Sequence, residues 1–251
     1  MGCNTVALKS NGATIRGAVS KPDGNGPFPA IVLLHGCGGP QPGNALWAAE
    51  LNKWGYVTME VDSFFHRGVK EICTDLKRVT VSERVVDAYA ALDYFRTLPF
   101  VVKDRIGVMG WSHGAMVVQS ALWQRRRLNE PRFKTGVAMY PWCDRTILYA
   151  PMLVIVGSAD DWTPSSRCSV YGRRRERRAP HLREHLAFVR QPWPDANVPG
   201  TSSRVQPSSD NASSEGCEGL PRSYSLVRRA AAYSSGRHTA RKLHQRQIRS
   251  S

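Results

Sequence analysis

Short runs of apolar residues recur through the first 164 residues, and segments with helical periodicity separate them. The runs are nearly continuous rather than alternating, which is typical of strands buried on both faces of a mainly parallel sheet. These predicted strands cover residues 29–36, 55–62, 104–110, 135–140 and 151–157. The predicted helices between them include residues 44–55 and 80–99.

The chain opens with a different pattern. Asn11 and Gly12 separate two short alternating runs within residues 6–22. The Asn-Gly pair favours a tight turn, because both positions tolerate positive φ. An antiparallel hairpin is therefore expected before the first parallel strand.

The helix predicted over residues 80–99 carries signals at both ends. Thr80 and Glu83 have capping-box spacing, and Pro99 stops the helix. Strands that alternate with helices in this way predict right-handed crossovers and an α/β fold with a doubly wound, mainly parallel sheet. In such a sheet, ligands bind at the carboxyl ends of the strands.

Composition changes abruptly after Pro164. Residues 165–251 hold 17 Lys and Arg against 6 Asp and Glu, which supplies most of the net charge of +15. They also hold few aliphatic residues, so ordering them would be poorly compensated by burial. We predict a core over residues 1–164 without a recognisable last strand, and an irregular or disordered basic Arg/Ser-rich tail over residues 165–251.

The tail has two interpretations. Its Arg, Ser, Pro and Gly content without periodicity resembles a gene translated in an altered frame or a disordered tail. A basic arm that binds nucleic acid is the weaker alternative, because aromatic residues are few and irregularly spaced.

The six cysteines are scattered, without a CxxC pair or a Cys/His cluster at metal-ligand spacing. Free thiols and no bound metal are expected. No run of about 18 apolar residues is present, and the first residues lack the pattern of a secretory signal. These features predict a soluble, cytoplasmic protein with no membrane partner.

A candidate nucleophile follows the strand predicted over residues 104–110. Residues 110–114 read Gly-Trp-Ser-His-Gly, and a helix-competent stretch comes next. A G-x-S-x-G motif between a strand and a helix predicts a sharp turn that exposes Ser112. The backbone N–H of His113 would then face a developing oxyanion, whereas the His113 side chain is expected to point away from Ser112.

A second candidate element ends the strand predicted over residues 29–36. The loop His35-Gly36-Cys37-Gly38-Gly39 lets backbone N–H groups approach a reacting carbonyl, and Cys37 is the expected main-chain donor. An ordinary turn is the alternative. Cys37 itself is not favoured as a nucleophile, because it lacks the strand-to-helix turn.

Carboxylates follow the strand predicted over residues 151–157. Asp160 and Asp161 lie downstream of Ser112, and a carboxylate at such a strand end can orient a catalytic histidine. The order Ser, Asp, His along the chain is that of α/β-hydrolases.

These segments together resemble the serine-bearing branch of the dienelactone hydrolase family of α/β-hydrolases. The resemblance rests on "PAIVLLHGCGG", "VDSFFHRG", "RIGVMGWSHGA", "YPWC" and "GSADDWTP", and it extends from about residue 5 to Pro164. It implies hydrolysis of a small-molecule ester, lactone or related carbonyl compound through an acyl-enzyme, with no cofactor. It also favours Asp160 over Asp161, and it matches Arg67 to an arginine that contacts acidic substrates in some relatives, with a solvated surface arginine as the alternative.

The resemblance stops where the family carries its catalytic histidine. The downstream histidines are His181, His185, His238 and His244, all in Arg-rich surroundings. His185 lies nearest the expected place and His181 is second, but absence of a working base is the leading expectation. The chain is thus expected to be a hydrolase that is impaired, or a pseudoenzyme that binds ligands without turnover.

Overall fold

The computed structural model describes residues 3–123, 130–144, 147–172 and 185–189. The chain divides into a unit over Met1–Cys217 and a second over Glu218–Ser251, and the second lies wholly outside the described residues. Most of the predicted basic tail is outside them as well, so its order and its affinity for nucleic acid stay predictions. None of the described helices is both long enough and apolar enough to span a bilayer.

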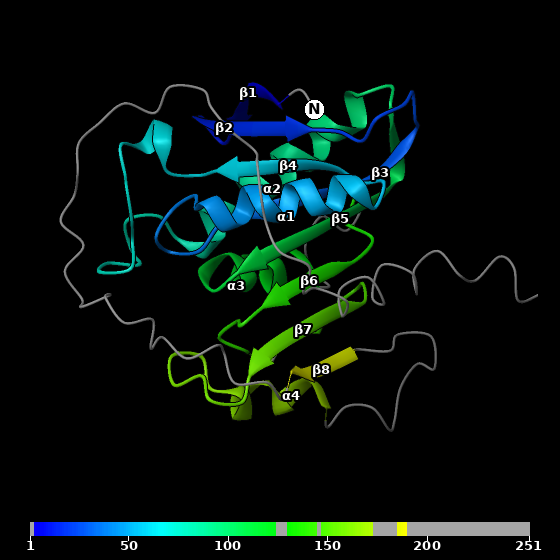
Figure 1. Ribbon diagram of the computed structural model, residues 1–251. Helices are drawn as coiled ribbons and strands as arrows, with labels where there is room; N and C mark the ends of the chain where they lie inside the picture. The colour runs from blue at the N-terminus through cyan, green and yellow to red at the C-terminus, as the bar shows by residue number, and fades with distance from the viewer. Residues whose placement is uncertain (1–2, 124–129, 145–146, 173–184, 190–251) are drawn as a thin grey trace, which may run out of the picture. The chain divides into compact units, whose positions relative to one another are not determined.

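One eight-stranded sheet organises the described residues, with strand order β1-β2-β4-β3-β5-β6-β7-β8 (Figure 1). The strands are β1 (Cys3–Ser10), β2 (Ala13–Ser20), β3 (Phe28–Leu34), β4 (Val57–Asp62), β5 (Val101–Trp111), β6 (Gly136–Met139), β7 (Met152–Gly157) and β8 (His185–Val189). The helices are α1 (Pro42–Lys53), α2 (Val81–Thr97), α3 (His113–Ala121) and α4 (Ser169–Gly172), with short 3₁₀ turns η1 (Phe65–Arg67) and η2 (Ser165–Cys168). Strands β3 to β8 are parallel, which confirms the predicted mainly parallel α/β sheet.

The predicted N-terminal hairpin is present. Strands β1 and β2 pair antiparallel, with Ser10 opposite Ala13. The two turn residues, Asn11 and Gly12, have φ of 42° and 80°, as a tight hairpin turn requires. Strand β2 then pairs antiparallel with β4 and joins the hairpin to the parallel part of the sheet.

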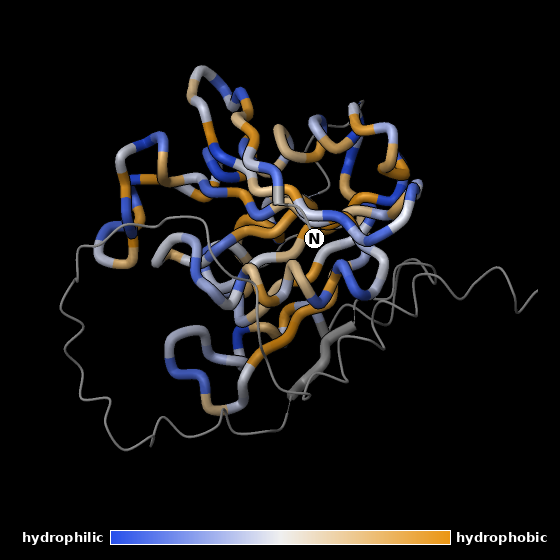
Figure 2. Tube along the Cα trace, turned by 45° about the horizontal axis from the view of Figure 1, so that its top comes forward, coloured by the Kyte–Doolittle hydropathy of each residue, from blue (hydrophilic) through white to orange (hydrophobic). Residues whose placement is uncertain are grey.

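Helices cover both faces of the sheet, and alternate residues of each strand face opposite layers. Leu33 and Met109 pack with α1 residues on one face, whereas Val32 and Val108 belong to the larger core shared with α2 and α3. Figure 2 shows apolar residues concentrated along the central strands. Because both faces are covered, the strands read as continuous apolar runs in the sequence.

Helix α2 begins as its sequence predicts. The Thr80 hydroxyl accepts a hydrogen bond from the Glu83 amide at 3.3 Å, and the Glu83 carboxylate accepts one from the Thr80 amide at 2.7 Å. This capping box satisfies backbone donors that the first turn leaves without partners. It fixes the start of the helix that carries the buried residues Arg84 and Asp87.

A last strand that the sequence did not make recognisable follows β7 in the sheet. Strand β8 pairs parallel with β7, from Leu153 opposite His185 to Gly157 opposite Val189. Only five residues, "HLAFV", form this strand, and charged residues precede and follow them in the sequence. The apolar run is too short to stand out among the charged residues around it in the sequence. Because β8 pairs with β7, β7 is not an edge strand.

The expectation of free thiols is wrong for four of the cysteines. Cys37 is joined to Cys73 and Cys143 is joined to Cys168 by disulfides. The paired residues lie 36 and 25 positions apart, so no local spacing pattern in the sequence predicts the two bridges. The first bridge links the loop after β3 to the segment before α2, and the second links the loop after β6 to η2.

Candidate functional site

Ser112 occupies the sharp turn between β5 and α3. Its backbone has φ of 50° and ψ of −115°, in a region that residues with a side chain rarely adopt. The Ser112 amide donates to the Met139 carbonyl at 3.0 Å, which fixes the turn against the end of β6. The residue is partly exposed, and it stands at the sharp strand-to-helix turn that the sequence predicts.

The two glycines of the motif are required by close backbone packing. A β-carbon on Gly110 would overlap the backbone of Gly114 across the turn. A β-carbon on Gly114 would overlap the backbone carbonyls of Leu34 and His35 at the end of β3. The motif therefore lets α3 start directly against the neighbouring strand, and this contact places Ser112 beside the loop that follows β3.

The loop after β3 lies against the serine turn, as predicted. A β-carbon on Gly36 would be 3.7 Å from the Ser112 β-carbon. The Cys37 carbonyl accepts a hydrogen bond from the Ile72 amide at 2.8 Å, and the Cys37 sulfur is bonded to Cys73. These two links hold the loop in place, and the disulfide leaves Cys37 without a thiol that could act as a nucleophile.

Asp160 lies in the turn after β7, at the same edge of the sheet as Ser112. Its carboxylate accepts hydrogen bonds from the Thr163 amide at 2.8 Å, the Thr163 hydroxyl at 2.7 Å and the Trp162 amide at 3.0 Å. These donors hold the carboxylate at the strand end. Asp161 is exposed.

Tyr140 connects the serine and aspartate turns, and the sequence analysis did not single it out. It directly follows Met139, which accepts the Ser112 amide, and its own amide donates to the Ile155 carbonyl at 2.6 Å. Burial, and then the Asp160 charge, raise the pKa of the Tyr140 hydroxyl. Its position at the carboxyl end of a predicted parallel strand was the signal that could have identified it.

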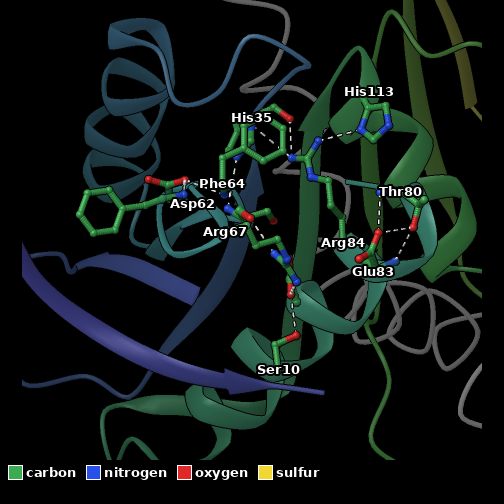
Figure 3. A network of polar contacts seen from close by, with 12 residues as sticks. Ser10, His35, Asp62, Phe64, Arg67, Thr80, Glu83, Arg84 and His113 are labelled. Atoms are coloured by element: carbon green, nitrogen blue, oxygen red, sulfur yellow. Dashed lines mark hydrogen bonds and ion pairs between the residues drawn. The ribbon is translucent and has the colours of Figure 1, made fainter. Parts of the chain in front are cut away.

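The two histidines beside Ser112 cannot take its proton in this arrangement (Figure 3). His113 Nδ1 lies 2.8 Å from Nη1 of Arg84, and because a guanidinium only donates, the His113 proton resides on Nε2. Burial, and then the Arg84 charge, lower the pKa of His113 to about 4. His35 Nε2 accepts from the Ser63 amide at 3.3 Å, so the His35 proton is on Nδ1, 2.8 Å from the Gly36 carbonyl.

The candidate base His185 begins β8, three strands away from the β5 strand that leads to Ser112. Ser112 follows Trp111, and the register places Trp111 in a row with Met139, Ile155 and Ala187. His185 begins β8 two residues before that row, and two further strands separate β8 from β5. With strands about 4.8 Å apart, the two backbones are more than about 10 Å apart, so the register does not bring them together. His181, His238 and His244 lie outside the described residues.

Arg67 has partners within the fold. Its guanidinium forms two hydrogen bonds to the Asp87 carboxylate, at 2.7 and 2.9 Å, and one to the Ser63 carbonyl at 2.6 Å. The Ser10 hydroxyl donates to the same carboxylate, so the hairpin, η1 and α2 meet at Asp87. These contacts give Arg67 a structural role rather than that of a solvated surface arginine, and contact with a substrate stays a prediction.

A cavity of about 180 Å³ opens on the α1 face of the sheet. Its lining includes His35, Glu60, Asp62 and Arg16, but neither Ser112 nor Asp160. It therefore adjoins the loop after β3 without containing the candidate nucleophile. Among the described residues, no three His, Cys, Asp or Glu side chains gather closely enough to hold a metal ion.

Comparison with solved structures shows the same fold in several hydrolases. A protein of Klebsiella pneumoniae assigned as a dienelactone hydrolase has a TM-score of 0.63 at 15% identity, covering 76% of this chain and 85% of that one. An esterase of Thermogutta terrifontis has a TM-score of 0.59 at 16% identity, covering 75% and 81%. The acylaminoacyl peptidase of Pyrococcus horikoshii has a TM-score of 0.57 at 20% identity, covering 76% of this chain but 37% of that protein.

Sequence comparison identifies the family. No curated protein sequence matches the chain significantly. The profile of the dienelactone hydrolase family matches residues 15–173, which include Ser112, Asp160 and both loops around them. The chain therefore belongs to the dienelactone hydrolase family, and by this resemblance it is an ester or lactone hydrolase.

Proposed function

We propose that this protein hydrolyses a small-molecule ester, lactone or related carbonyl compound through an acyl-enzyme formed on Ser112. The observation that carries the proposal is the Ser112 turn, which combines a strained backbone, an accessible side chain and the adjacent Gly36 loop. A residue held at positive φ without being glycine marks a position where the fold maintains strain. Serine at that position is suited to nucleophilic attack.

The reaction would begin with attack of the Ser112 hydroxyl oxygen on the substrate carbonyl carbon. The carbonyl oxygen then becomes negative, and the backbone N–H groups of Cys37 and His113 would stabilise it. His113 is the first residue of α3, so its N–H has no acceptor within the helix and the helix dipole adds positive potential there. Collapse of the tetrahedral intermediate expels the alcohol and leaves the acyl group on Ser112, and water hydrolyses that ester in the second half-reaction.

Asp160 would orient the histidine that accepts the Ser112 proton. Its carboxylate is fixed at the strand end by Thr163 and Trp162, which suits a residue that holds an imidazole in one orientation. His35 is unsuited to the role of base because both of its ring nitrogens are hydrogen-bonded, and His113 is unsuited because Nδ1 accepts from Arg84 and Nε2 carries the proton. The proposed reaction therefore requires another histidine as the base.

A fluorophosphonate probe tests the nucleophile directly. We expect covalent labelling of Ser112, located by peptide mapping, and loss of p-nitrophenyl acetate hydrolysis in Ser112→Ala. Ser120→Ala is a matched control because Ser120 lies farther along α3, outside the turn. Equal labelling of the wild type and of Ser112→Ala would contradict the proposal.

The position of His185 favours a second candidate, a protein that binds esters or lactones without turnover. Loss of one triad member removes several orders of magnitude in rate but leaves binding and oxyanion stabilisation in place. The two candidates are separated by measuring binding and turnover for one panel of esters and lactones. Binding without labelling of Ser112 would favour the second.

The disulfides also bear on the compartment in which the protein is found. Disulfides persist in oxidising compartments and are rare in the cytosol. The Cys37–Cys73 and Cys143–Cys168 bridges thus weigh against the predicted cytoplasmic location, and we infer an oxidising compartment. Alkylation of free thiols during isolation, followed by peptide mapping, checks this inference. Alkylated Cys37, Cys73, Cys143 and Cys168 would contradict it.

A further inference from the structure

Arg84 is the largest fully buried side chain among the described residues. It lies in the first turn of α2, and its side chain extends toward His35 and His113 (Figure 3). Arginine is almost never fully buried without specific partners, because removing its charge from water costs several kcal/mol. Its contacts therefore indicate what this position does.

The Arg84 guanidinium joins the two segments that flank Ser112. One terminal nitrogen, Nη2, donates to the His35 carbonyl at 2.7 Å. The other, Nη1, donates to His113 Nδ1 at 2.8 Å. One planar group thus bonds both the peptide that leads into Gly36 and the residue directly after Ser112.

The positive charge of Arg84 has no direct counterion within the described residues. No carboxylate there lies within ion-pair distance of its guanidinium, and the nearby Asp87 is paired with Arg67. Its Nε is buried without a hydrogen-bond partner, and the Phe64 ring centroid lies 5.3 Å from its central carbon. A buried charge that is not neutralised by contact projects a stronger potential than one in water.

We propose that Arg84 is a positioning residue of the hydrolase site, which clamps the His35–Cys37 segment to the serine turn and holds positive charge behind the oxyanion donors. Its bond to the His35 carbonyl polarises the His35–Gly36 peptide at the start of the loop. Its bond to His113 fixes the residue whose backbone N–H is the second donor. Arg84 touches neither the substrate nor Ser112, so it acts through these two segments.

Only arginine has the shape for both bonds. The guanidinium presents two terminal nitrogens in a rigid plane, whereas lysine offers one compact ammonium. The acceptors match this donor: His113 is held neutral with Nδ1 free of a proton, and the His35 carbonyl oxygen accepts from Nη2. Replacement by lysine keeps the charge but loses one arm of the clamp.

The inference rests on the proposed hydrolase function, and the experiment is designed so that each can fail separately. Arg84→Met removes both the clamp and the charge, and Arg84→Lys retains the charge. Arg96→Met, at the last turn of the same helix, is the matched control. Urea unfolding establishes which variants are folded before any rate is compared.

For folded variants, we expect the rate constant for fluorophosphonate labelling of Ser112 to fall about tenfold or more in Arg84→Met, with an intermediate value in Arg84→Lys. With p-nitrophenyl acetate, kcat should fall while KM changes little, because the ground-state ester does not touch Arg84. Arg96→Met should match the wild type. Wild-type labelling by a folded Arg84→Met would overturn the proposal.

Nuclear magnetic resonance of the imidazole nitrogens tests the clamp without activity. In the wild type, the His113 proton should reside on Nε2 and the ring should stay neutral down to about pH 4. Arg84→Met should raise the pKa of His113. A neutral wild-type His113 with its proton on Nδ1 would overturn the clamp, even if no Arg84 variant folded. Failure of Ser112 to react in the wild type would instead count against the hydrolase function alone.

Discussion

The backbone of Gly114 packs directly against the Leu34 carbonyl, so closely that a β-carbon on Gly114 would overlap it. This contact joins the first turn of α3 to the end of β3. It therefore sets how near the Ser112 turn lies to the loop carrying Gly36 and Cys37. A catalytic arrangement here depends on glycine for a steric reason that can be tested by substitution.

Gly114→Ala should strongly destabilise the protein, because rigid backbone rather than a mobile side chain occupies the space that the methyl group needs. Overpacking of cores typically costs about 1 to 3 kcal/mol, and a backbone clash should reach or exceed the upper end. Urea denaturation gives the change. Gly43→Ala in α1 is the control, because nothing lies within 4 Å of its added β-carbon. Similar unfolding free energies for the two variants would contradict the packing argument.

Asp160→Asn should slow the reaction of Ser112 while leaving the protein folded. The amide can keep hydrogen bonds at the strand end but cannot stabilise an imidazolium, and loss of this charge in a related triad costs on the order of 10⁴ in kcat. Fluorophosphonate labelling rates measure the effect. Asp161→Asn is the control, because Asp161 is exposed beside it. If both variants react equally fast, Asp160 is not the orienting acid.

His185→Ala should react at the wild-type rate, because the β8 register places His185 away from the row that ends at Ser112. Labelling by the same probe tests this expectation. Alanine substitutions at His181, His238 and His244 complete the set, and the base is the position whose loss abolishes labelling. A large loss in His185→Ala would show that the strand register does not hold in solution.

The disulfides should contribute measurably to stability. Loops of 36 and 25 residues correspond to about 3 to 4 kcal/mol each in the chain-entropy treatment, although strain and unfolded-state structure reduce such values. Dithiothreitol should therefore lower the urea midpoint and also loosen the Cys37 loop. Cys73→Ser should reduce labelling of Ser112 more than Cys168→Ser, because only the first bridge holds the loop beside Ser112. Unchanged unfolding after complete reduction would contradict the bridges.

Local patterns in the sequence were enough to predict most of the sheet. Asn11-Gly12 marked the hairpin, and the Thr80–Glu83 box marked the start of α2, because each signal acts over a few residues. The Ser112 turn was equally predictable, because its glycines, strand and helix are contiguous in the chain. Predictions of this kind succeed where the structure is decided by neighbours in sequence.

Features decided by distant residues were missed. Arg84 reads as an ordinary charged residue near a helix start, yet its partners are His113 and His35, 29 and 49 positions away. The pairing of Arg67 with Asp87 is similarly invisible until η1 and α2 are placed together. Both cases involve burial of charge, which depends on the assembled fold rather than on periodicity.

Glu60 should make the protein less stable as pH rises from about 5 to about 7. Burial raises the pKa of its carboxyl from 4.5 to about 7, so over this range the folded state retains a proton that the unfolded state has released. Ionisation of Glu60 in the fold then costs free energy above pH 7, on the order of 1 to 3 kcal/mol after allowance for its partial exposure. Glu60→Gln should match the wild type near pH 5 and be more stable at pH 8, in urea denaturation at each pH. Glu50→Gln is the control, because Glu50 forms a surface ion pair with Lys53 at 3.3 Å. A wild-type stability that rises between pH 5 and pH 8, with no difference in Glu60→Gln, would show that the carboxyl remains hydrated in the cavity on the α1 face.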